Sequence, residues 1–528
     1  MIRIRQIKVE FTKSNVDTLK EICASKLKIK VSDIKSFKIN KKSIDARKKP
    51  LLYFVYEIDI EVNNEDKILK NNKSLDILRV SEEEYQFKIT GNKKLNNRPV
   101  IIGSGPAGLF CAYILAENGY KPIIIERGEK IEERVKTVET FWKNGNLNPN
   151  SNVQFGEGGA GTFSDGKLNT QVKDKENRKK KIFDTFINCG AASDIAYESH
   201  PHIGTDMLRN VVINMRNKII KMGGEFKYNT CLTDIKVNNN KLESIILNKK
   251  QELKTDVLVL AIGHSARDTF NMLYKHNLMM EPKPFAIGVR IQHPQKLINK
   301  NQYGMEYHEL LEAANYKLTY KASNNRGVYS FCMCPGGYVV NSTSEENRTC
   351  INGMSNHARD SKNANSAIIV TVSPKDFGNN PLDGIKFQEK LEEKTYKLGS
   401  GKIPVQLFKD YKNNIESTKL GNIEPIFKGE YTLANINTIF PDYINEALKE
   451  GIAAFDKNIK GFASDDAILS AIESRTSSPV RIVRNEYGIS SIDGIYPCGE
   501  GAGYAGGITS AAIDGIKIAE FIASIYKN

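Results

Sequence analysis

The hydrophobic and polar positions of residues 1–95 predict a small α+β module. Apolar and charged residues alternate over Ile2–Phe11, as in a half-buried strand, and a helical pattern follows over Asn15–Leu27. Further strands are expected at Ile34–Asn40 and Leu51–Val62. The polar stretch 91–97 is typical of a linker, so a second unit is expected to begin near residue 96.

The most informative pattern lies just after this linker. An apolar strand runs into Gly103-Ser104-Gly105-Pro106-Ala107-Gly108, an alanine-rich helix follows, and a second apolar strand ends at Glu126. Gly103 suits the tight turn, Gly105 lets the backbone approach a pyrophosphate, and Gly108 permits close helix–strand packing. Glu126 stands 23 positions after Gly103, where an acid can bond a ribose hydroxyl. With every part present, the pattern predicts dinucleotide binding rather than an unrelated glycine turn.

The later pattern predicts that an insertion interrupts this nucleotide-binding sheet. Asp256–Gly263 is almost wholly apolar, as a buried central parallel strand should be. Punctuated strands such as Phe285–Gln292 then form an inserted α+β layer, and Ile495–Glu500 with a helix over Thr509–Ile525 returns to the first sheet. We therefore expect an α/β fold in four segments: a basic α+β module, the nucleotide-binding domain, an inserted substrate domain and the C-terminal return, at 1–95, 96–281, 282–460 and 461–528.

The C-terminal return is a second glycine-rich junction between a strand and a helix. The strand ends at Gly499 and Glu500, and Gly506-Gly507-Ile508 opens the last helix. Two such junctions in one sheet favour FAD over NAD alone. Glu500 is placed to bond the ribityl chain, and the N–H groups that begin the helix are placed to face the flavin ring. The alternative is a helix that only packs on the sheet through small residues.

A third glycine-rich segment, Phe155–Leu168, is interpreted as a cofactor or substrate loop. Gly161, Thr162 and Asp165 are candidate cofactor contacts, and Lys167 is a candidate to stabilise a reduced flavin anion. The alternative is a flexible surface loop. Neither this segment nor Gly501–Gly506 forms a second strand–turn–helix–strand unit. NADH or NADPH is considered as electron donor, and it would have to bind without such a unit.

Three further groups are candidates for chemistry. Cys332 and Cys334 alternate along a strand and would share a face, as a redox pair or as two buried structural thiols. Arg475 belongs to a donor-rich segment suited to a carboxylate or phosphate substrate, or to a capped turn. His264 follows the central strand and is either a general acid–base or part of a fixed loop. No Cys or His spacing suits a metal site.

Composition and charge narrow the classes of function. No apolar run approaches the length that a membrane helix needs, and the N-terminus lacks the hydrophobic core of a secretory signal. Eight cysteines in 528 residues are too few for a disulfide framework. A cytoplasmic protein is expected. The net charge is +14, of which residues 1–95 carry +8. An RNA-binding surface is one interpretation, but abundant Lys, Asn and Ile also suit an AT-rich genome, which we prefer.

Six segments together resemble the largely uncharacterised bacterial family of FAD-dependent dehydrogenases, or FAD-dependent proteins, over nearly the whole chain: Val100–Gly108, Phe155–Leu168, Ala261–Thr269, Phe331–Gly337, Glu473–Arg481 and Tyr496–Gly507. The FAD domain is similar, more distantly, to the glutathione-reductase and p-hydroxybenzoate-hydroxylase group. The resemblance implies non-covalent FAD with its adenine near Leu232, and it adds Arg127, Ala261 and Gly263 to the expected cofactor contacts. Departures are the lack of cysteine between Cys111 and Cys189, where disulfide reductases carry their pair, and Glu500 where Asp is usual.

The function expected from these observations is an FAD-dependent oxidoreductase that passes hydride through flavin N5 to or from a small-molecule substrate. The catalytic candidates are Lys167, Cys332, Cys334 and Arg475. The alternatives are an RNA-interacting flavoprotein that modifies bases and a non-catalytic flavin redox module. No membrane partner is expected, and the oligomeric state is left open.

Overall fold

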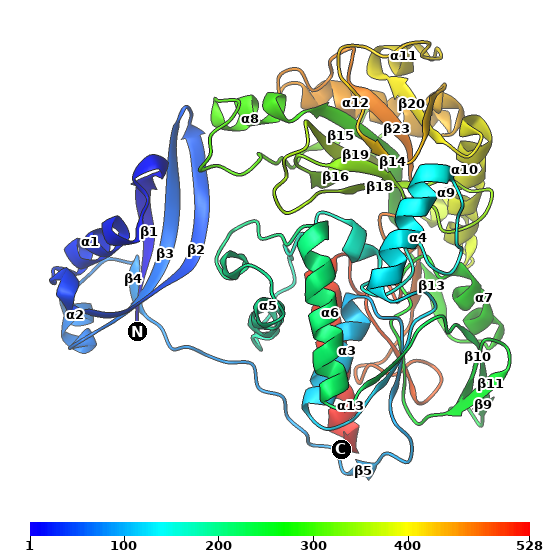
Figure 1. Ribbon diagram of the computed structural model, residues 1–528, viewed down its shortest axis with the longest axis horizontal. Coiled ribbons are helices and arrows are strands. Elements are labelled where there is room, and N and C mark those ends of the chain that lie inside the picture. Colours follow the sequence, from blue (N-terminus) through cyan, green and yellow to red (C-terminus); the bar gives the residue numbers. More distant parts are fainter.

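The computed structural model describes residues 1–528, and its N-terminal module is a sheet with two helices packed on it (Figure 1). The sheet order is β2-β3-β1-β4. Alternate side chains of β1 and β3 are buried against α1, as the period-2 pattern requires. The elements of this module are β1 (Ile2–Glu10), α1 (Val16–Leu27), β2 (Ile34–Lys48), β3 (Leu51–Val62), α2 (Glu65–Asn71) and β4 (Ile77–Arg79).

The β2–β3 hairpin carries the basic run and touches the rest of the protein. β2 extends to Lys48, eight residues beyond the strand expected from the sequence. Lys42 pairs with Glu198 at 2.7 Å, Arg47 pairs with Asp45, and Lys49 donates to the carbonyl of Asn301. Part of the positive charge is therefore engaged within the chain. RNA binding by this module stays a prediction.

A five-stranded, wholly parallel sheet forms the core of the second unit, in the order β25-β12-β6-β7-β8. Most of its strands are three consecutive apolar residues, because both faces are covered. The segment before it runs along the last helix and ends in β5 (Lys93–Lys94), which pairs with β26 (Tyr526–Lys527). The five strands are β6 (Val100–Ile102), β7 (Ile123–Ile125), β8 (Glu225–Lys227), β12 (Leu258–Leu260) and β25 (Ile495–Pro497).

Helices cover one face of this sheet and a small antiparallel sheet covers the other. On the first face, Gly515 of the last helix lies so close to α3 that an added Cβ would stand 2.2 Å from the carbonyl oxygen of Ala107. The small residues of both helices allow this approach, and Figure 1 shows α3, α6 and α13 side by side. The covering helices are α3 (Pro106–Glu117), α5 (Arg178–Asn188), α6 (Thr205–Lys221) and α13 (Ile508–Ile525).

The other face of the sheet packs on α7 (Arg267–Lys275) and on a small antiparallel sheet of β9 (Leu232–Asn238), β10 (Lys241–Leu247) and β11 (Gln251–Lys254). The amphipathic helix α4 (Ile131–Asn144) follows β7.

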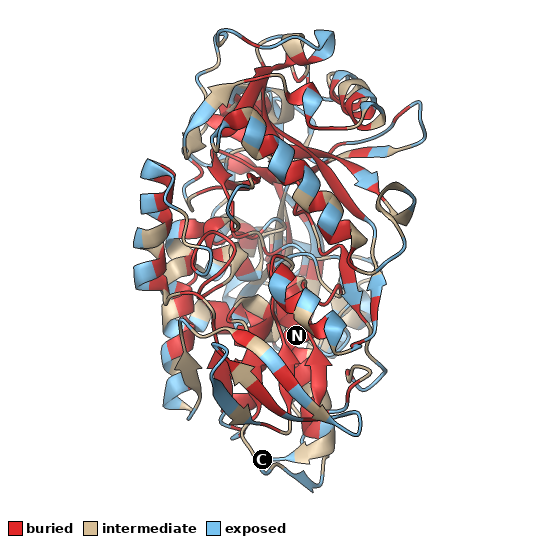
Figure 2. Cartoon of the chain, turned by 90° about the vertical axis from the view of Figure 1, so that its right-hand side faces the viewer, coloured by how far each residue is buried: buried red, intermediate tan, exposed pale blue.

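The inserted unit is built on a seven-stranded sheet, in the order β15-β16-β19-β14-β23-β20-β22. Its two longest strands, β14 and β19, are buried along almost their whole length. Figure 2 shows buried residues in the sheets and exposed residues on the outer faces of the helices. The strands are β14 (Phe285–Pro294), β15 (Thr319–Lys321), β16 (Gly327–Cys334), β19 (Asn363–Val372), β20 (Ile403–Leu407), β22 (Tyr431–Leu433) and β23 (Ile468–Glu473). A side sheet holds β17 (Tyr338–Asn341), β18 (Ile351–Met354) and β21 (Phe427–Lys428), and the helices are α8 (Gln295–Tyr303), α9 (Pro374–Phe377), α10 (Asp383–Gly399), α11 (Phe408–Asn413) and α12 (Asp442–Phe455).

The end of the insertion differs from the boundary expected at residue 460. β23 lies beyond that boundary, yet it is hydrogen-bonded between β14 and β20 in the inserted sheet. The chain returns to the first unit only at β24 (Val480–Ile482), which pairs with β13 (Met280–Pro282). An apolar strand carries no local sign of which sheet it joins, so the sequence pattern could not assign β23. None of the helices combines the length and the apolar character that a membrane crossing requires.

Candidate functional site

A cavity of about 370 Å³ lies where the central sheet, the starts of α3 and α13 and the inserted unit meet. Most of the residues singled out from the sequence line it. They are Gly103, Gly105, Pro106, Ala107, Glu126, Arg127, Gly161, Asp165, Lys167, Leu232, Ala261, Gly263, Cys332, Arg475, Glu500, Gly506, Gly507 and Ile508. Segments that lie about 400 residues apart in the chain thus form one site.

The first glycine turn has the geometry that the sequence pattern implies. Gly103 has a φ of +98°, and an added Cβ there would stand 2.3 Å from the carbonyl oxygen of Ala261. An added Cβ on Gly108 would meet the carbonyl oxygen of Gly103 at 1.9 Å. Gly105 differs, because the nearest protein atom to an added Cβ is the Cα of Gly159, at 3.7 Å. Gly103 and Gly108 are therefore required by the fold, whereas Gly105 leaves space that belongs to the cavity.

Glu126 lies at the end of β7 and is held by four protein donors. One carboxylate oxygen accepts from the N–H and the hydroxyl of Ser104, at 2.9 and 2.7 Å, and the other accepts from the N–H groups of Gly128 and Gly156, both at 3.0 Å. The carboxylate therefore fixes the glycine turn to the loop at 156 as well as lining the cavity. Its bond to a ribose hydroxyl stays a prediction, because these four donors already match the roughly four acceptor positions of a carboxylate.

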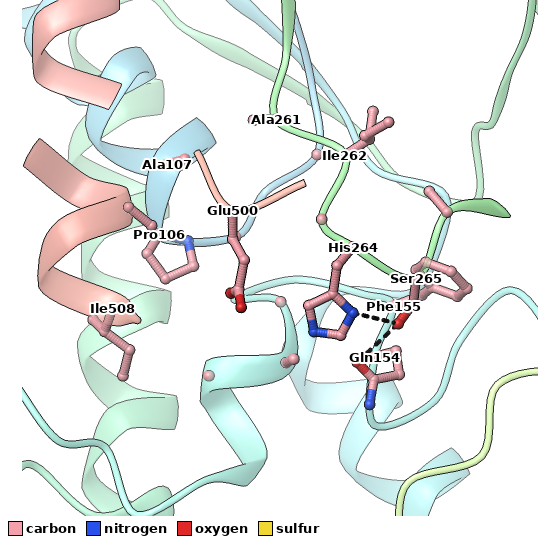
Figure 3. Close-up of a pocket in the computed structure, with 18 of the residues that line it drawn as sticks. Pro106, Ala107, Gln154, Phe155, Ala261, Ile262, His264, Ser265, Glu500 and Ile508 are labelled. Atoms are coloured by element: carbon pink, nitrogen blue, oxygen red, sulfur yellow. Dashed lines mark hydrogen bonds between the residues drawn. The ribbon is translucent and has the colours of Figure 1, made fainter. Parts of the chain in front are cut away.

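Glu500 follows β25, an edge strand of the central sheet. It points into the cavity from the loop before α13 (Figure 3). Its carboxyl group makes no hydrogen bond or ion pair within the chain, although Lys283 is near enough to lower its pKa. Burial raises the pKa of Glu500 to about 7, and the nearby Cys332 acts in the same direction. No side chain caps the starting N–H groups of either α3 or α13. A partly buried acid and two free helix N-termini therefore face one space.

Five of the predicted residues lie behind the cavity wall rather than in it. Ser104 is bound to Glu126, the Thr162 hydroxyl lies 3.5 Å from the carbonyl oxygen of Glu157, and the Gly499 N–H donates to Asp514. The other two are Gly108, packed on Gly103, and Cys334. These residues shape the turns that carry the lining.

His264, Ser265 and Gln154 form a chain of hydrogen bonds in the wall (Figure 3). The Gln154 amide nitrogen donates to the carbonyl of Ser342, so its oxygen faces Ser265 and accepts the serine hydroxyl at 3.2 Å. The serine has then used its one hydrogen, so the 3.1 Å contact with His264 uses the Nδ1 hydrogen of the imidazole. Burial, assisted by Arg475 and Arg267, lowers the pKa of His264 to about 3. His264 is therefore neutral, with its lone pair on Nε2.

The sequence raised His264 as a candidate but gave no sign of its partners. Gln154 is 111 positions from Ser265 along the chain, and no local motif connects them. The free Nε2 belongs to a ring that lines the cavity. The hydrogen bonds therefore show that the loop fixes the ring, and a general acid–base role for its free Nε2 stays a prediction.

The expectation that Cys332 and Cys334 share one face needs correction. The pairing of β16 with β19 is interrupted between Phe331 and Cys334, and Cys332 has a φ of +45°. This bulge breaks the strict alternation of a strand. As a result Cys332 lines the cavity, while Cys334 is fully buried behind it next to Arg290.

Arg475 lines the cavity, but four of its five N–H donors are already used. It bonds both carboxylate oxygens of Glu392 at 2.9 and 2.8 Å, the hydroxyl of Ser344 at 2.5 Å and Glu345 at 3.2 Å. Arg267 binds the same two acids, so a fully buried Glu392 stands between two arginines. The predicted role of Arg475 in holding a substrate carboxylate or phosphate is therefore not what its contacts favour. Glu392, 83 positions earlier in the chain, could not be anticipated from the sequence.

Lys167 is the cation in the wall that retains freedom to bind. Its side chain is 29% exposed, and its ammonium lies 3.8 Å from Asp165. Asp165 is held by two hydrogen bonds from Arg359, at 3.0 and 2.5 Å. Burial opposes ionisation of Asp165, but Lys167 and Arg359 hold its pKa below its usual range. Asp165 is therefore a fixed anion that orients Lys167.

The residues of this site fit FAD. The starts of α3 and α13 supply donors for a pyrophosphate and for an electron-rich ring edge. Added Cβ atoms on Gly263, Gly506 and Gly507 would meet nothing within 4 Å, so a flat molecule can lie against this backbone. The unpartnered carboxyl of Glu500 is suited to sugar-like hydroxyl groups.

Comparison with known proteins agrees with this geometry. Family models match residues 284–476 as the C-terminal domain of FAD-dependent proteins, residues 101–156 as an NAD(P)-binding Rossmann-like domain, and residues 1–61 as a domain of unknown function. An uncharacterised protein of Clostridium beijerinckii is 51% identical over 528 residues, which cover 99% of this chain and 98% of that protein.

Solved structures give weaker likenesses. A flavin-dependent brominase matches with a TM-score of 0.36 and 13% identity, over 81% of this chain and 79% of that one. L-proline dehydrogenase from P. horikoshii matches with a TM-score of 0.35 and 12% identity, over 81% and 94%. Glycine oxidase from Bacillus cereus matches with a TM-score of 0.31 and 11% identity, over 81% and 95%. On the family matches and the full-length relative, the chain belongs to the family of FAD-dependent proteins and has a mixed α/β flavoprotein fold.

Proposed function

We propose that this chain is an oxidoreductase that holds FAD non-covalently in the cavity and exchanges hydride with a small-molecule substrate. The observation that carries the proposal is the convergence of two uncapped helix N-termini and an unpartnered acid, Glu500, on one space. Bound FAD supplies a two-electron carrier whose N5 atom accepts or donates hydride.

In this proposal the glycine turns bind the cofactor and the side chains around them serve the reaction. Gly105 and the start of α3 accommodate the pyrophosphate, and Glu500 accepts ribityl hydroxyl groups. Lys167 stabilises negative charge on the ring when electrons arrive, because Asp165 holds it at the cavity wall. The Nε2 atom of His264 accepts a hydrogen bond and so orients a donor group in the cavity. The positive charge of Arg475 helps to keep His264 neutral, because it lowers the pKa of the imidazole.

The cofactor is tested by release and by one substitution. Denaturing the purified protein should release FAD in an amount close to one per chain. Gly105→Val should weaken FAD binding by about 100-fold, because the side chain is tolerated by the protein but occupies pyrophosphate space. Gly327→Val is the matched control, since an added Cβ there has 3.9 Å to its nearest neighbour and lies on β16. A Gly105→Val protein that keeps its full FAD content would refute the placement.

The electron donor is tested separately. NADH or NADPH is added anaerobically, and bleaching of the flavin absorption band is followed. Fast bleaching by one of them identifies a nicotinamide donor that binds without a second glycine turn. No bleaching excludes that donor and shifts the weight to a substrate dehydrogenase or to another electron carrier.

A further inference from the structure

Cys332 and Cys334 are held in an unusual local arrangement at the edge of the cavity. Cys332 adopts a left-handed backbone conformation, which a side chain other than glycine rarely takes without a reason. Arg290, fully buried, donates to the Cys332 carbonyl from both terminal nitrogens at 3.3 Å, and Glu473 and Asn365 fix the same guanidinium. The bulge is therefore fastened from the interior of the inserted sheet.

This arrangement sets one thiol in front of the other. The Cys334 thiol lies 3.3 Å from the carbonyl oxygen of Cys332, so its sulfur is packed against the backbone of its neighbour. Cys332 faces the cavity and Cys334 does not. An accessible thiol backed by a buried one is the arrangement of an attacking and a resolving cysteine.

The surroundings also favour the reactive form of the accessible thiol. A hydrogen bond from Cys334 lowers the pKa of Cys332 to about 6 against the effect of burial, and Lys167 and Arg290 act in the same direction. The pKa of Cys334 is raised well above its usual value by Cys332 and by burial. Both shifts favour the thiolate form of Cys332, on the side of the cavity, and the protonated form of Cys334.

We infer that Cys332 and Cys334 form a reversible dithiol–disulfide couple that passes two electrons between the cavity and an external disulfide. The inference rests on the proposed function, which supplies the reduced flavin as the reductant. The substrate class is then a small disulfide, or the thiol that it yields. The pair stands on β16 of the inserted sheet, far along the chain from the first glycine turn.

The chemistry balances in two stages. The Cys332 thiolate attacks one sulfur of the external disulfide, which forms a mixed disulfide and releases the first thiol as thiolate. Cys334 loses its proton and attacks the Cys332 sulfur, which releases the second thiol and leaves an internal sulfur–sulfur bond. Two electrons from the reduced flavin, with two protons, then break that bond and restore both thiols.

The test counts electrons and thiols in the flavin-loaded protein. The protein is treated with oxidised glutathione, freed of excess, and titrated anaerobically with dithionite. The wild type should take up two electrons for the flavin and two more for the disulfide, whereas Cys332→Ser should take up only the flavin's two. Cys334→Ser lacks the resolving thiol, so it should retain one glutathione as a mixed disulfide on Cys332, which the mass of the protein shows. Cys23→Ala, in the core of the N-terminal module, is the control and should behave as the wild type.

A second readout does not depend on the flavin. Alkylation and mass spectrometry of the oxidised wild type should show the peptide with Cys332 and Cys334 unalkylated and lighter by two hydrogens. If the protein binds flavin, takes up only two electrons and alkylates at both cysteines after oxidation, the couple does not exist and the proposed function stands. If no flavin binds, the proposed function fails, and the peptide mapping still judges the pair.

Discussion

The two walls of the cavity differ in whether backbone or side chains line them. The Rossmann-like side contributes all nine of the glycines that line it, whereas the inserted unit contributes none and presents Phe331, Cys332, Asn352, Glu473, Arg475 and Thr476. A backbone wall can lie against a large, flat and invariant molecule, because such a molecule is recognised by N–H groups and close approach. A side-chain wall can be changed residue by residue. The division suggests a holder for the cofactor on one side and selection of its reaction partner on the other.

The sharpest way to break this comparison is to alter each wall in turn. Gly507→Val places a side chain in open cavity space at the start of α13 and should lower FAD affinity by about 100-fold. Phe331→Ala, on the opposite wall, should leave the FAD content unchanged. FAD bound per folded chain is measured by absorbance after gel filtration. Equal losses in both variants would show that the inserted unit also holds the cofactor.

The side-chain wall should depend on the buried charge cluster for its stability. Glu392→Gln leaves Arg267 and Arg475 without their shared carboxylate, which we expect to cost about 3–5 kcal/mol of unfolding free energy. Chemical denaturation measures the change. The neighbouring Glu393→Gln is the control, since its side chain is 47% exposed and contacts only Arg348. A Glu392→Gln protein as stable as the control would mean that the cluster does not support this wall.

Glu500 allows the backbone wall to be tested by pH. Its carboxyl has a pKa of about 7, so the ionised fraction rises about tenfold between pH 6 and 8. Hydroxyl donors of FAD favour the ionised form, and FAD affinity should rise by up to roughly that factor over the same range. Glu500→Gln should remove the dependence in an equilibrium titration. An unchanged slope in this variant would assign the titration to another group.

The same residue affects the stability of the protein without FAD in the opposite sense. A carboxyl whose pKa is higher in the folded than in the unfolded chain binds more protons when folded. Its contribution is therefore present below the unfolded pKa and is lost as pH rises to about 7. Thermal unfolding of the FAD-free wild type and of Glu500→Gln over this range would separate the two effects.

The smallest expected effect concerns His264. Its ring should show the Nδ1–H tautomer by ¹⁵N NMR and should not titrate above pH 5, because burial and two arginines lower its pKa to about 3. Ser265→Ala removes the acceptor of that hydrogen and should allow the other tautomer to appear. His276, which is partly exposed and paired with Asp234, serves as the comparison within the same spectrum. An Nε2–H signal for His264 in the wild type would contradict the hydrogen-bond assignment.

The difference between the walls also explains what the sequence could predict. The glycine turn at Gly103–Gly108 and the return at Glu500 are local patterns, because a few consecutive residues are enough to indicate the backbone geometry of each. The family matches confirm the flavoprotein fold that these patterns predicted. The partners of the side-chain wall are long-range: Glu392 meets Arg475 across 83 positions, and Arg290 reaches the Cys332 carbonyl across 42. The bulge that turns Cys334 away from the cavity likewise depends on pairing with β19, which no local spacing reveals.

The position of α13 has a consequence for biosynthesis. The strand β25, Glu500 and the start of this helix complete the cavity, although the glycine turn on the other side of the sheet is translated some 400 residues earlier. A nascent chain that stops before residue 508 has only half of the binding surface and should remain colourless. Acquisition of the yellow cofactor would then mark molecules whose translation has passed this point.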